Sequence, residues 1–507
     1  MLKNRLSCFI HIIIIGMILF IACKQDVQAT SEHGVLRLAH IYAWGGEESL
    51  DPASSKRFIP AILMLYERLV RLDKDRNPCP DLAESWESDS TSRKFTFHLR
   101  RNVRFHNGKP LTAKDVVYTF KHILNPDVGS PAASALNIID AEAFETPNEH
   151  TVVFNLRKPH ADFPLLLTHN QIRIISEGSA PTIGKTGIGT GPFKLAKLDV
   201  KGTTVLAAND DYHGGQPGLK RIDIVRIADK NAQVYAMLDD LIDSVSSISS
   251  VQAQLFEENK EFTVQELPNG LMHTLVMNTT VAPFNDVRVR KAMKYVVDRR
   301  KMIDLVLRGH GVAGYDHPVF PNDPYRLVLE RPQDIEKARV LLAEAGYPDG
   351  LDVELYVADK NAYMVIMALV YKEMAAKAGI RVKIRFVPAK NYWDAIWKKV
   401  PFCGSMWDER TADQILSEAY LSGAKWNDSF WSNPQFDQLL SDARKEQYPE
   451  KRKVFYQEAQ RLVVEEGGTI IPFFENTIRV LRSDIDGIPV DLSRDNIDWA
   501  RVSNCSI

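Results

Sequence analysis

Residues 275–310 read LVMNTTVAPFNDVRVRKAMKYVVDRRKMIDLVLRGH and decide the fold. The apolar run Leu275 to Met277 predicts a strand that ends at Asn278. A proline then interrupts regular structure, and Asn285 or Asp286 can cap the helix that follows. The apolar residues of that helix recur at helical spacing and form one face; they are Val289, Ala292, Met293, Val296 and Val297. Strand, polar turn and capped amphipathic helix together predict the entry into an α/β lobe.

The opposite face of this helix is basic, because it carries Arg288, Arg290, Lys291 and Lys294. A run of charge on one helix face is most often exposed to solvent. We expect that arrangement here. The basic face by itself therefore assigns no function.

The stretch also carries a family resemblance. MNTTVAPFNDVRVRKAMKYVVDRRKMID, residues 277–304, resembles the extracytoplasmic solute-binding proteins of family 5, the peptide/nickel class, which serve ABC importers for dipeptides, oligopeptides, opines and nickel. Further motifs resemble the same family in the same order along the chain. They are LDPA at 50–53, LYERL at 65–69, LAESWE at 82–87, FTFHLR at 95–100, VRFHNGKPLTAKDVVYTF at 103–120 and GTGPF at 189–193.

The first residues predict export. Lys3 and Arg5 precede an apolar run, Phe9 to Ala22, that is shorter than the roughly 20 residues of a membrane span. This pattern is typical of a secretory signal peptide. Alanine directly before Cys23 resembles a lipoprotein processing site, so we predict that Cys23 is lipidated. Cleavage near residues 27–29 is the alternative. The expected location is the periplasm or the outer face of the cytoplasmic membrane.

Bulk composition excludes one class of partner and leaves the disulfides open. The net charge is −2, from 63 basic and 65 acidic residues, without the concentrated basic surface that nucleic acid needs. Cys8 leaves with the signal peptide and Cys23 is the lipidation site. Among Cys79, Cys403 and Cys505 at most one disulfide can form, and the spacing does not choose a pair.

Helices and strands alternate through the second half, which predicts α/β lobes with mainly parallel strands. The resemblance implies a two-lobed Venus flytrap fold of the periplasmic binding protein type II, with a small extra domain in the first lobe. Two chain crossings join the lobes. The implied bounds are a signal peptide at 1–22, a tether at 23–34, first-lobe segments at 35–61, 186–277 and 480–507, the extra domain at 62–185, and a second lobe at 278–479.

The candidate ligand site is the sequence around Trp407, Asp408, Glu409, Arg410 and Asp413, within a tryptophan-rich region. A carboxylate can accept hydrogen bonds from an ammonium group, arginine can clamp a carboxylate, and an indole can stack on a cation. The residues therefore suit a zwitterion. The resemblance implies that Asp408 or Glu409 holds the α-amino group of a peptide. The alternative is a surface loop that pairs its own charges, with tryptophans in the core.

Two further residues are candidates. Trp44 follows the first predicted strand, where the family's first lobe faces the cleft, although simple packing explains it equally well. Asn278 lies near the expected crossing between the lobes. A hinge or cleft-lining role for Asn278 competes with a plain capping role.

Two other sequence patterns, a glycine-rich segment and the histidines, do not indicate a nucleotide or metal site. Gly187-x-Gly189-x-Gly191 suggests a nucleotide loop, but a proline follows at once and a strand continues, so the anion-binding helix terminus is missing. The histidines are scattered, and no metal-binding spacing occurs. We therefore expect no metal, no cofactor and no catalytic residues.

We predict a non-enzymatic binding component of an ABC importer. It captures di- or oligopeptides between its lobes by hinge closure, with an ABC permease and its ATPase subunits as partners and a monomer as its expected state. An opine, a glycoside or a nickel chelate is the alternative ligand. A secreted peptide hydrolase and a lipid-anchored sensor or chaperone are alternatives from other classes.

Overall fold

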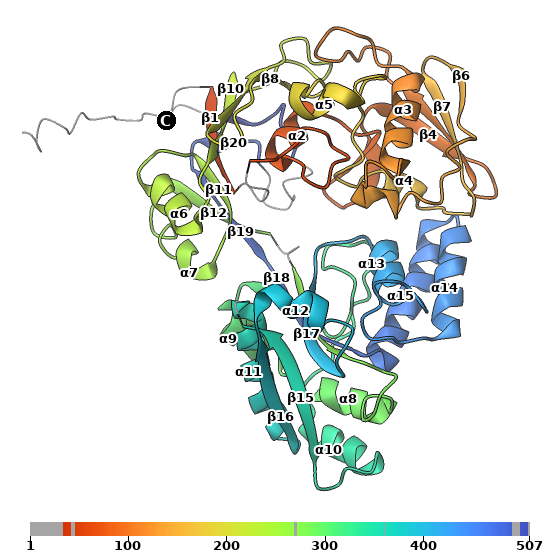
Figure 1. Cartoon of the computed structure of the whole chain (residues 1–507), viewed down its shortest axis with the longest axis vertical. Helices are drawn as coiled ribbons and strands as arrows, with labels where there is room; N and C mark the ends of the chain where they lie inside the picture. Colours follow the sequence, from red (N-terminus) through yellow and green to blue (C-terminus); the bar gives the residue numbers. More distant parts are fainter. Residues whose placement is uncertain (1–33, 42–45, 268–270, 360, 489–496, 505–507) are drawn as a thin grey trace, which may run out of the picture.

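The computed structural model describes residues 34–41, 46–267, 271–359, 361–488 and 497–504. Cys23 and Trp44, for which we predict lipidation and ligand contact, lie outside these residues, as does Cys505. Figure 1 shows an upper lobe built from both ends of the chain and a lower lobe built from its second half. No helix among the described residues is long and apolar enough to cross a membrane.

The first lobe is built on a seven-stranded sheet in the order β12-β19-β11-β1-β10-β9-β8. β1 runs parallel to β10 and to β11, and the other neighbours are antiparallel. The strands are β1 (Val35–His40), β8 (Phe193–Lys197), β9 (Thr203–Ala208), β10 (Arg221–Arg226), β11 (Ser244–Ile248), β12 (Phe262–Leu267) and β19 (Thr477–Arg482). Its helices are α2 (Ile59–Leu65), α5 (Ala180–Thr186), α6 (Lys230–Leu238) and α7 (Ser250–Ala253), and the short strands β20 (Ile485–Asp486) and β21 (Ser503–Asn504) form a ladder near the C-terminus.

The extra domain of the first lobe has its own sheet, in the order β4-β5-β7-β6, and every pair in it is antiparallel. Phenylalanines from its sheet and helices form a buried core, in which Phe97 and Phe154 meet edge to face at 5.4 Å. The elements are β2 (Val70–Leu72), β3 (Pro78–Pro80), β4 (Ala83–Ser88), β5 (Lys94–Leu99), β6 (Glu145–Asn148), β7 (Thr151–Asn155), α3 (Ala113–Leu124), the 3-10 turn Pro131–Ala133, and α4 (Phe163–Leu166).

The second lobe has a six-stranded sheet in the order β14-β18-β13-β17-β15-β16. β15 runs parallel to β16 and β17, whereas β13 runs antiparallel to β17 and β18. The strands are β13 (Met272–Met277), β14 (Gly311–Ala313), β15 (Leu351–Ala358), β16 (Ile380–Val387), β17 (Phe402–Trp407) and β18 (Thr469–Glu475). The helices are α8 (Val287–Tyr295), α9 (Arg299–Leu307), α10 (Ile335–Glu344), α11 (Ala362–Ala376), α12 (Ala389–Ala395), α13 (Ala412–Ala419), α14 (Pro434–Lys445) and α15 (Pro449–Glu466).

The stretch 275–310 forms the expected strand and helix. β13 ends at Met277, and Asp286 caps α8 by accepting a hydrogen bond from the Arg288 amide at 2.8 Å. The solvent-exposed basic face is a wrong prediction for two of its residues. Arg290 is 7% exposed and Lys294 is 0% exposed, because both side chains reach carbonyl oxygens at the end of α15. The partner helix lies more than 160 residues further along the chain, beyond any local pattern.

The expectation of mainly parallel strands is also wrong, since both large sheets are mixed. Alternating helices and strands indicate parallel pairing only where each helix returns the chain to the same edge. Here β8 and β9 form an antiparallel ladder instead, and β13, β17 and β18 come from distant segments that meet antiparallel.

Two crossings join the lobes, from β12 to β13 and from β18 to β19. The second sheet therefore begins at Met272 and the first sheet resumes at Thr477, before the boundaries that we expected at 278 and 480. At the crossings Asn476 Nδ2 donates to a Glu266 carboxylate oxygen at 2.6 Å. The other oxygen of Glu266 lies 3.0 Å from His310 Nδ1 in the second lobe. This side chain thus ties the first lobe to both crossings and to the second lobe.

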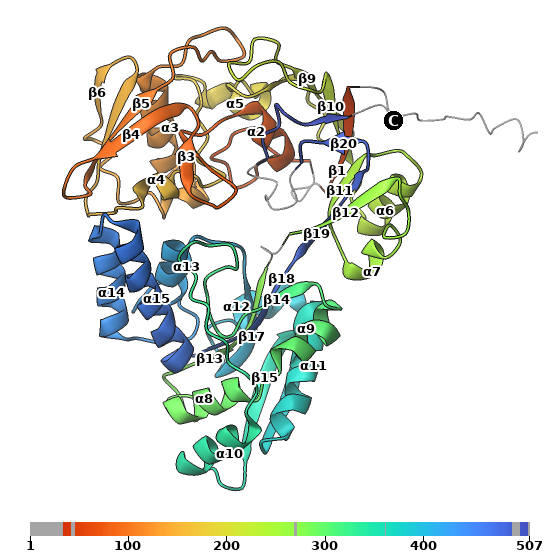
Figure 2. The same cartoon turned by 180° about the vertical axis from the view of Figure 1, so that it is seen from behind.

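A second contact region joins the lobes away from the crossings. Figures 1 and 2 show α14 and α15 directly below the extra domain in both views. The Ala161 amide donates to the Arg444 carbonyl at 2.7 Å, and Gln447 Nε2 donates to the Asp89 carbonyl at 2.7 Å. The lobes are therefore attached at two separate regions, the crossings and this contact.

Candidate functional site

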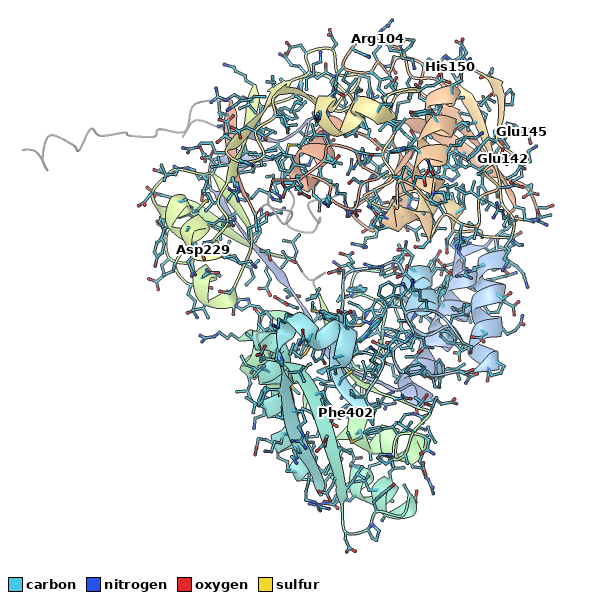
Figure 3. The ribbon with its side chains drawn as sticks, viewed as in Figure 1. Arg104, Glu142, Glu145, His150, Asp229 and Phe402 are labelled. Atoms are coloured by element: carbon cyan, nitrogen blue, oxygen red, sulfur yellow. The ribbon has the colours of Figure 1, made fainter. Side chains whose placement is uncertain are left out.

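The loop 408–411 connects β17 to α13 and lies at the edge of the second lobe that faces the first. In the register of β17 and β13, Phe402 pairs with Met277 and Trp407 pairs with Met272, the first residue of β13 after the crossing. β17 therefore runs toward the crossings and ends beside them. Figure 3 shows its first residue, Phe402, on the part of the second lobe away from the first.

Glu409 shows directly that this loop faces the first lobe. Its carboxylate forms an ion pair with Arg76 in the turn between β2 and β3 of the extra domain. Both side chains are largely shielded, at 23% and 17% exposure. In this arrangement Glu409 bridges the lobes.

Asp408 is exposed, and its carboxylate has no hydrogen-bond or ion-pair partner among the described residues. The neighbouring Arg410 makes its contacts with the loop and with α13. Its guanidinium donates to the Glu409 carbonyl at 3.1 Å and contacts the Glu418 carboxylate at 3.4 Å. Of the loop's two carboxylates, Asp408 is thus the one that a ligand can reach without first breaking an ion pair.

Trp407 is half-buried at the end of β17. It packs against a core cluster of the second lobe that includes Met272, Tyr325 and Ile415. One side of the indole is therefore held by the core, and the rest is open at the lobe edge. Such an anchored ring can pack against a ligand with little loss of side-chain freedom.

Asp413 lies in the first turn of α13 and is 6% exposed. Its oxygens accept from Arg444 at 2.8 and 3.0 Å and from the Tyr456 hydroxyl at 3.1 Å, and one lies 3.3 Å from His160 Nε2. Burial alone raises the pKa of Asp413, but Arg444 and His160 outweigh it and hold that pKa well below its usual range. The geometry is that of a structural ion pair, with all the acceptor capacity used inside the protein.

His160 belongs to the first lobe, so this cluster also joins the lobes. Asp162 extends it, because its carboxylate meets Arg452 at 2.7 Å and the Tyr325 hydroxyl at 3.0 Å. Burial raises the pKa of Asp162 even though Arg452 and His160 act against the shift. Sequence patterns predicted Asp413 as a site residue but not this interlobe cluster, since its residues lie in four separate segments. They are His160, Asp162, Tyr325, Asp413, Arg444, Arg452 and Tyr456.

The expectation that Asn278 lies at the lobe crossing is wrong. Its amide donates to the Pro401 carbonyl, and its side-chain oxygen accepts from the amide and hydroxyl of Thr280 at 3.0 and 2.7 Å. Asn278 thus forms a local turn at the far end of β13, and the register separates it from Trp407 by the length of the strand. The alternative of a capping residue describes this geometry.

The remaining tryptophans of the region divide into two groups. Trp431 is 4% exposed and belongs to the core. Trp393, Trp397 and Trp426 form a surface group, with ring centroids 6.3 Å apart for the first pair and 5.5 Å apart for the second. Trp397 also donates to the Asp428 carboxylate at 3.2 Å. The tryptophan-rich composition therefore marks a core residue and a surface group as well as the loop.

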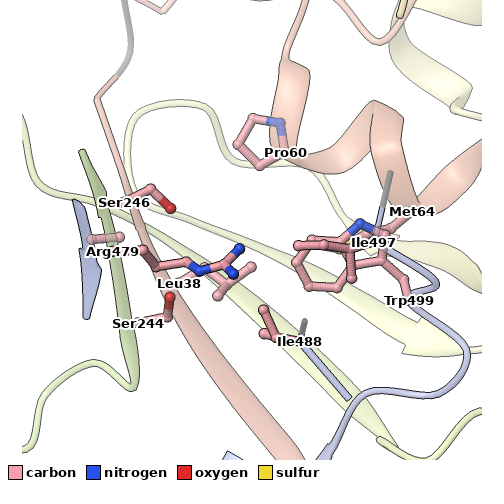
Figure 4. A pocket seen from close by; sticks show the side chains of 10 residues that line it. Leu38, Pro60, Met64, Ser244, Ser246, Arg479, Ile488, Ile497 and Trp499 are labelled. Atoms are coloured by element: carbon pink, nitrogen blue, oxygen red, sulfur yellow. The ribbon is translucent and has the colours of Figure 1, made fainter. Parts of the chain in front are cut away.

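A pocket in the first lobe was missed by the sequence analysis. It lies between the sheet, α2 and the C-terminal segment (Figure 4), and Arg479 is its charged residue among the described lining residues. Alternation along β19 could have indicated that Arg479 points inward, but the partner strands come from distant segments. The lining residues are Leu38, Ala39, Pro60, Met64, Ser244, Ser246, Arg479, Ile488, Ile497 and Trp499.

The described residues show neither a metal-binding group nor a reactive thiol. Within them no group of three or more His, Cys, Asp or Glu side chains is placed to hold a metal ion. Cys79 and Cys403 are free thiols, and burial raises the pKa of Cys403 to about 12. A thiol with that pKa is a poor nucleophile at neutral pH.

Comparison with known proteins agrees with the two-lobed architecture. Residues 77–428 match the family described as bacterial extracellular solute-binding proteins, family 5. The chain is 27% identical to heme-binding protein A of Haemophilus influenzae, covering 79% of each chain. It is 25% identical to the probable D,D-dipeptide-binding periplasmic protein DdpA of Escherichia coli, covering 83% of this chain and 85% of the relative. The solved structure of HbpA2 from Haemophilus parasuis superimposes with a TM-score of 0.83 at 23% identity, covering 93% of this chain and 100% of that one, which shows the fold.

Proposed function

We propose a peptide-capturing role for this chain, which belongs to the bacterial extracellular solute-binding proteins of family 5. Proteins of this family act outside the cytoplasm as non-enzymatic binding components that deliver ligands to ABC permeases. The secreted hydrolase that the sequence left open is therefore wrong. What remains to be proposed is the ligand and the way in which it is held.

The observation that carries the proposal is the exposed carboxylate of Asp408. It stands at the edge of the second lobe that faces the first, and Asp408 directly follows the half-buried Trp407 in sequence. A carboxylate without a protein partner is a ready acceptor for an ammonium group, and charge-assisted hydrogen bonds are stronger than neutral ones. We assign Asp408 as the anchor for the α-amino group of a short peptide, with Trp407 packing against the adjoining residue.

The mechanism that follows is closure about the crossings. Ligand contacts from both lobes exist together only in the closed state, so the ligand shifts a pre-existing equilibrium toward closure. Glu409 and Arg410 keep the loop in place through Arg76 and Glu418. In this proposal they position Asp408 and do not themselves bind the ligand.

We also propose where the protein acts and which partner it serves. Lipidation of Cys23 would hold the protein at the outer face of the membrane, where it would pass its ligand to the permease as a monomer. Among relatives, one is named for a D,D-dipeptide and one for heme, so the ligand class differs within the family. The exposed acceptor at Asp408 favours a ligand with an ammonium group, which a peptide carries.

The test is calorimetric titration with the tripeptide Ala-Ala-Leu and its N-acetylated form. We expect the wild type to bind the free tripeptide at least tenfold more tightly than the acetylated one, because acetylation removes the ammonium charge. Asp408→Asn should bind the free tripeptide about tenfold more weakly and no longer distinguish the two.

Asp304→Asn is the matched control, since it removes an exposed carboxylate from α9, on another side of the second lobe. It should titrate like the wild type. Equal affinity of wild type and Asp408→Asn would contradict the assigned anchor. Failure of the wild type to bind any free tripeptide would contradict the peptide as ligand.

A further inference from the structure

We propose that an aromatic surface of the second lobe docks on an anionic lipid bilayer. The surface, which we name the tryptophan face, is formed by α12 and two loops, and its side chains are Trp393, Trp397, Lys398, Lys425, Trp426 and Phe430. This inference goes beyond the proposed function, because it concerns the surface on which the protein rests and holds for any ligand between the lobes.

The rings of the tryptophan face form a continuous series. The ring centroids of Trp393 and Trp397 are 6.3 Å apart, and those of Trp397 and Trp426 are 5.5 Å apart. Lys398 Nζ lies 5.8 Å from the Trp397 centroid and 5.2 Å from the Phe430 centroid, so it joins Phe430 to the series. Trp393 is 43% exposed, Trp426 49% and Phe430 37%. A contiguous apolar surface of this kind is a common mark of an interaction site.

Hydrogen bonds hold the tryptophan face in place. The Tyr392 hydroxyl donates to a β17 carbonyl at 2.7 Å and fixes α12 to the sheet. Trp397 Nε1 donates to the Asp428 carboxylate at 3.2 Å, and Lys398 Nζ donates to the Lys425 carbonyl at 2.6 Å. Figure 1 shows α12 on the outside of the second lobe. The rings are therefore ordered before a partner arrives, so docking costs little side-chain freedom.

Charge indicates which partner fits. Segments 389–400 and 424–430 contain four lysines and two aspartates, although the whole chain has a net charge of −2. One of the aspartates, Asp428, is only 5% exposed. Three of the lysines are exposed; they are Lys390, Lys399 and Lys425. Tryptophan favours the headgroup level of a bilayer, and anionic lipids attract lysine, so the tryptophan face complements an anionic bilayer in both respects.

A second exposed apolar surface, on α6 and the segment after it, lacks this complementarity. It includes Tyr235, Leu238 and Leu255, which are 64%, 40% and 55% exposed. Residues 229–261 contain seven acidic and two basic side chains, so an anionic bilayer would repel this surface. Tyr235 therefore provides an exposed aromatic control outside the tryptophan face.

The first experiment measures sedimentation with lipid vesicles. It uses the mature chain with Cys23→Ser, so that no attached lipid contributes to binding. We expect at least tenfold tighter binding to vesicles of equal parts phosphatidylcholine and phosphatidylglycerol than to pure phosphatidylcholine, because the lysines respond only to the anionic lipid. Added salt should reduce this preference.

Variants separate the apolar and the electrostatic contributions. Trp393→Ala and Trp426→Ala should each weaken binding to the anionic vesicles several-fold, because less apolar area enters the bilayer. Lys399→Gln and Lys425→Gln should each weaken it about fivefold and leave binding to pure phosphatidylcholine unchanged. Tyr235→Ala is the matched aromatic control and should bind like the parent chain. Thermal unfolding establishes that each variant is folded.

The second experiment identifies the rings that enter the bilayer. Phosphatidylcholine with brominated acyl chains quenches the fluorescence of an indole that reaches the acyl region. Anionic vesicles made with this lipid should quench part of the tryptophan fluorescence of the parent chain. In the double variant Trp393→Phe, Trp426→Phe the quenched part should largely disappear, because the other tryptophans stay away from the lipid.

The outcomes decide the proposal without reference to the peptide. It is overturned if the parent chain does not bind anionic vesicles, or if Trp393→Ala and Trp426→Ala bind them as tightly as the parent. Sedimentation velocity supplies a further check: a dimer of the parent chain that both tryptophan variants abolish would assign the face to a second copy and overturn the bilayer. Failure of the tripeptide titrations would leave the bilayer contact standing.

Discussion

Lys294 is buried within the second lobe, and its ammonium group donates to the carbonyls of Val463 and Val464 at 3.1 and 2.9 Å. These carbonyls lie in the last turn of α15, where the helix dipole favours a cation. Burial nevertheless lowers the pKa of Lys294 to about 7, and nearby Asp316 only partly opposes the shift. The residue is thus a titrating group that helps to join α8 to α15.

Lys294 should make stability depend on pH above neutrality. The unfolded chain keeps the lysine proton up to its ordinary pKa of about 10.4, while the folded chain releases it near 7. The unfolded state therefore binds more protons in this interval, and the free energy of unfolding rises with pH by up to about 1.4 kcal/mol per pH unit. Urea titrations at pH 7, 8 and 9 should measure the free energy of unfolding of the wild type and of Lys294→Met. As pH rises, that free energy should increase for the wild type relative to the variant.

Lys301→Met is the control for this prediction, because Lys301 is exposed on α9. Its pH profile should run parallel to that of the wild type. If the profiles of wild type and Lys294→Met are also parallel, the ammonium group of Lys294 keeps an ordinary pKa in the folded protein.

At the scale of elements, the contact of α13, α14 and α15 with the extra domain depends on one carboxylate. Asp413 of α13 meets Arg444 of α14, Tyr456 of α15 and His160 of the first lobe. Sequence patterns could predict α13 as a helix after the loop, and they brought Asp413 into the candidate site. They could not predict its burial, because its partners come from segments that meet only through tertiary packing.

Asp413→Ala should destabilise the protein by about 3 kcal/mol, because it leaves His160 and Arg444 without their carboxylate. The value lies at the low end for a buried pair, since Arg444 is 29% exposed. Urea unfolding at pH 7 measures it. The pKa of Asp413 is held well below its usual range, so the stabilisation is present above the unfolded pKa of about 4 and is lost as pH falls toward the folded pKa.

The difference in free energy of unfolding between the wild type and Asp413→Ala should therefore become smaller below pH 4. Asp304→Asn, at an exposed carboxylate, serves again as the control and should change the free energy of unfolding little. A gap that stays constant from pH 7 to pH 3 would mean that the carboxylate is not ionised by its partners in the folded state.

At the scale of the whole molecule, ordered motifs along the chain were enough to predict the family and its two-lobed fold. The order and direction of the strands in the sheets could not be predicted, because strands such as β13, β17 and β18 pair across long separations in sequence. The candidate loop was predicted as a set of residue types. Which charged members of the loop are paired depends on Arg76 and Glu418, which the local sequence does not reveal.

The two attachment regions constrain how the lobes can move. One is formed by the crossings with Glu266, His310 and Asn476, and the other is the interlobe cluster around Asp413. A rotation that keeps both intact must have its axis close to both. The Glu409–Arg76 ion pair is a further contact between the lobes, so any closer approach of the edge that carries Asp408 must rearrange it.

We propose that a short peptide is captured between the two lobes. Native mass spectrometry of the purified mature protein, before and after mild unfolding and refolding, tests it most directly. We expect a removable added mass that resolves into short peptides and that Asp408→Asn retains less well. A discrete non-peptide mass, or no added mass together with no thermal shift from a panel of di- to pentapeptides, would contradict the claim.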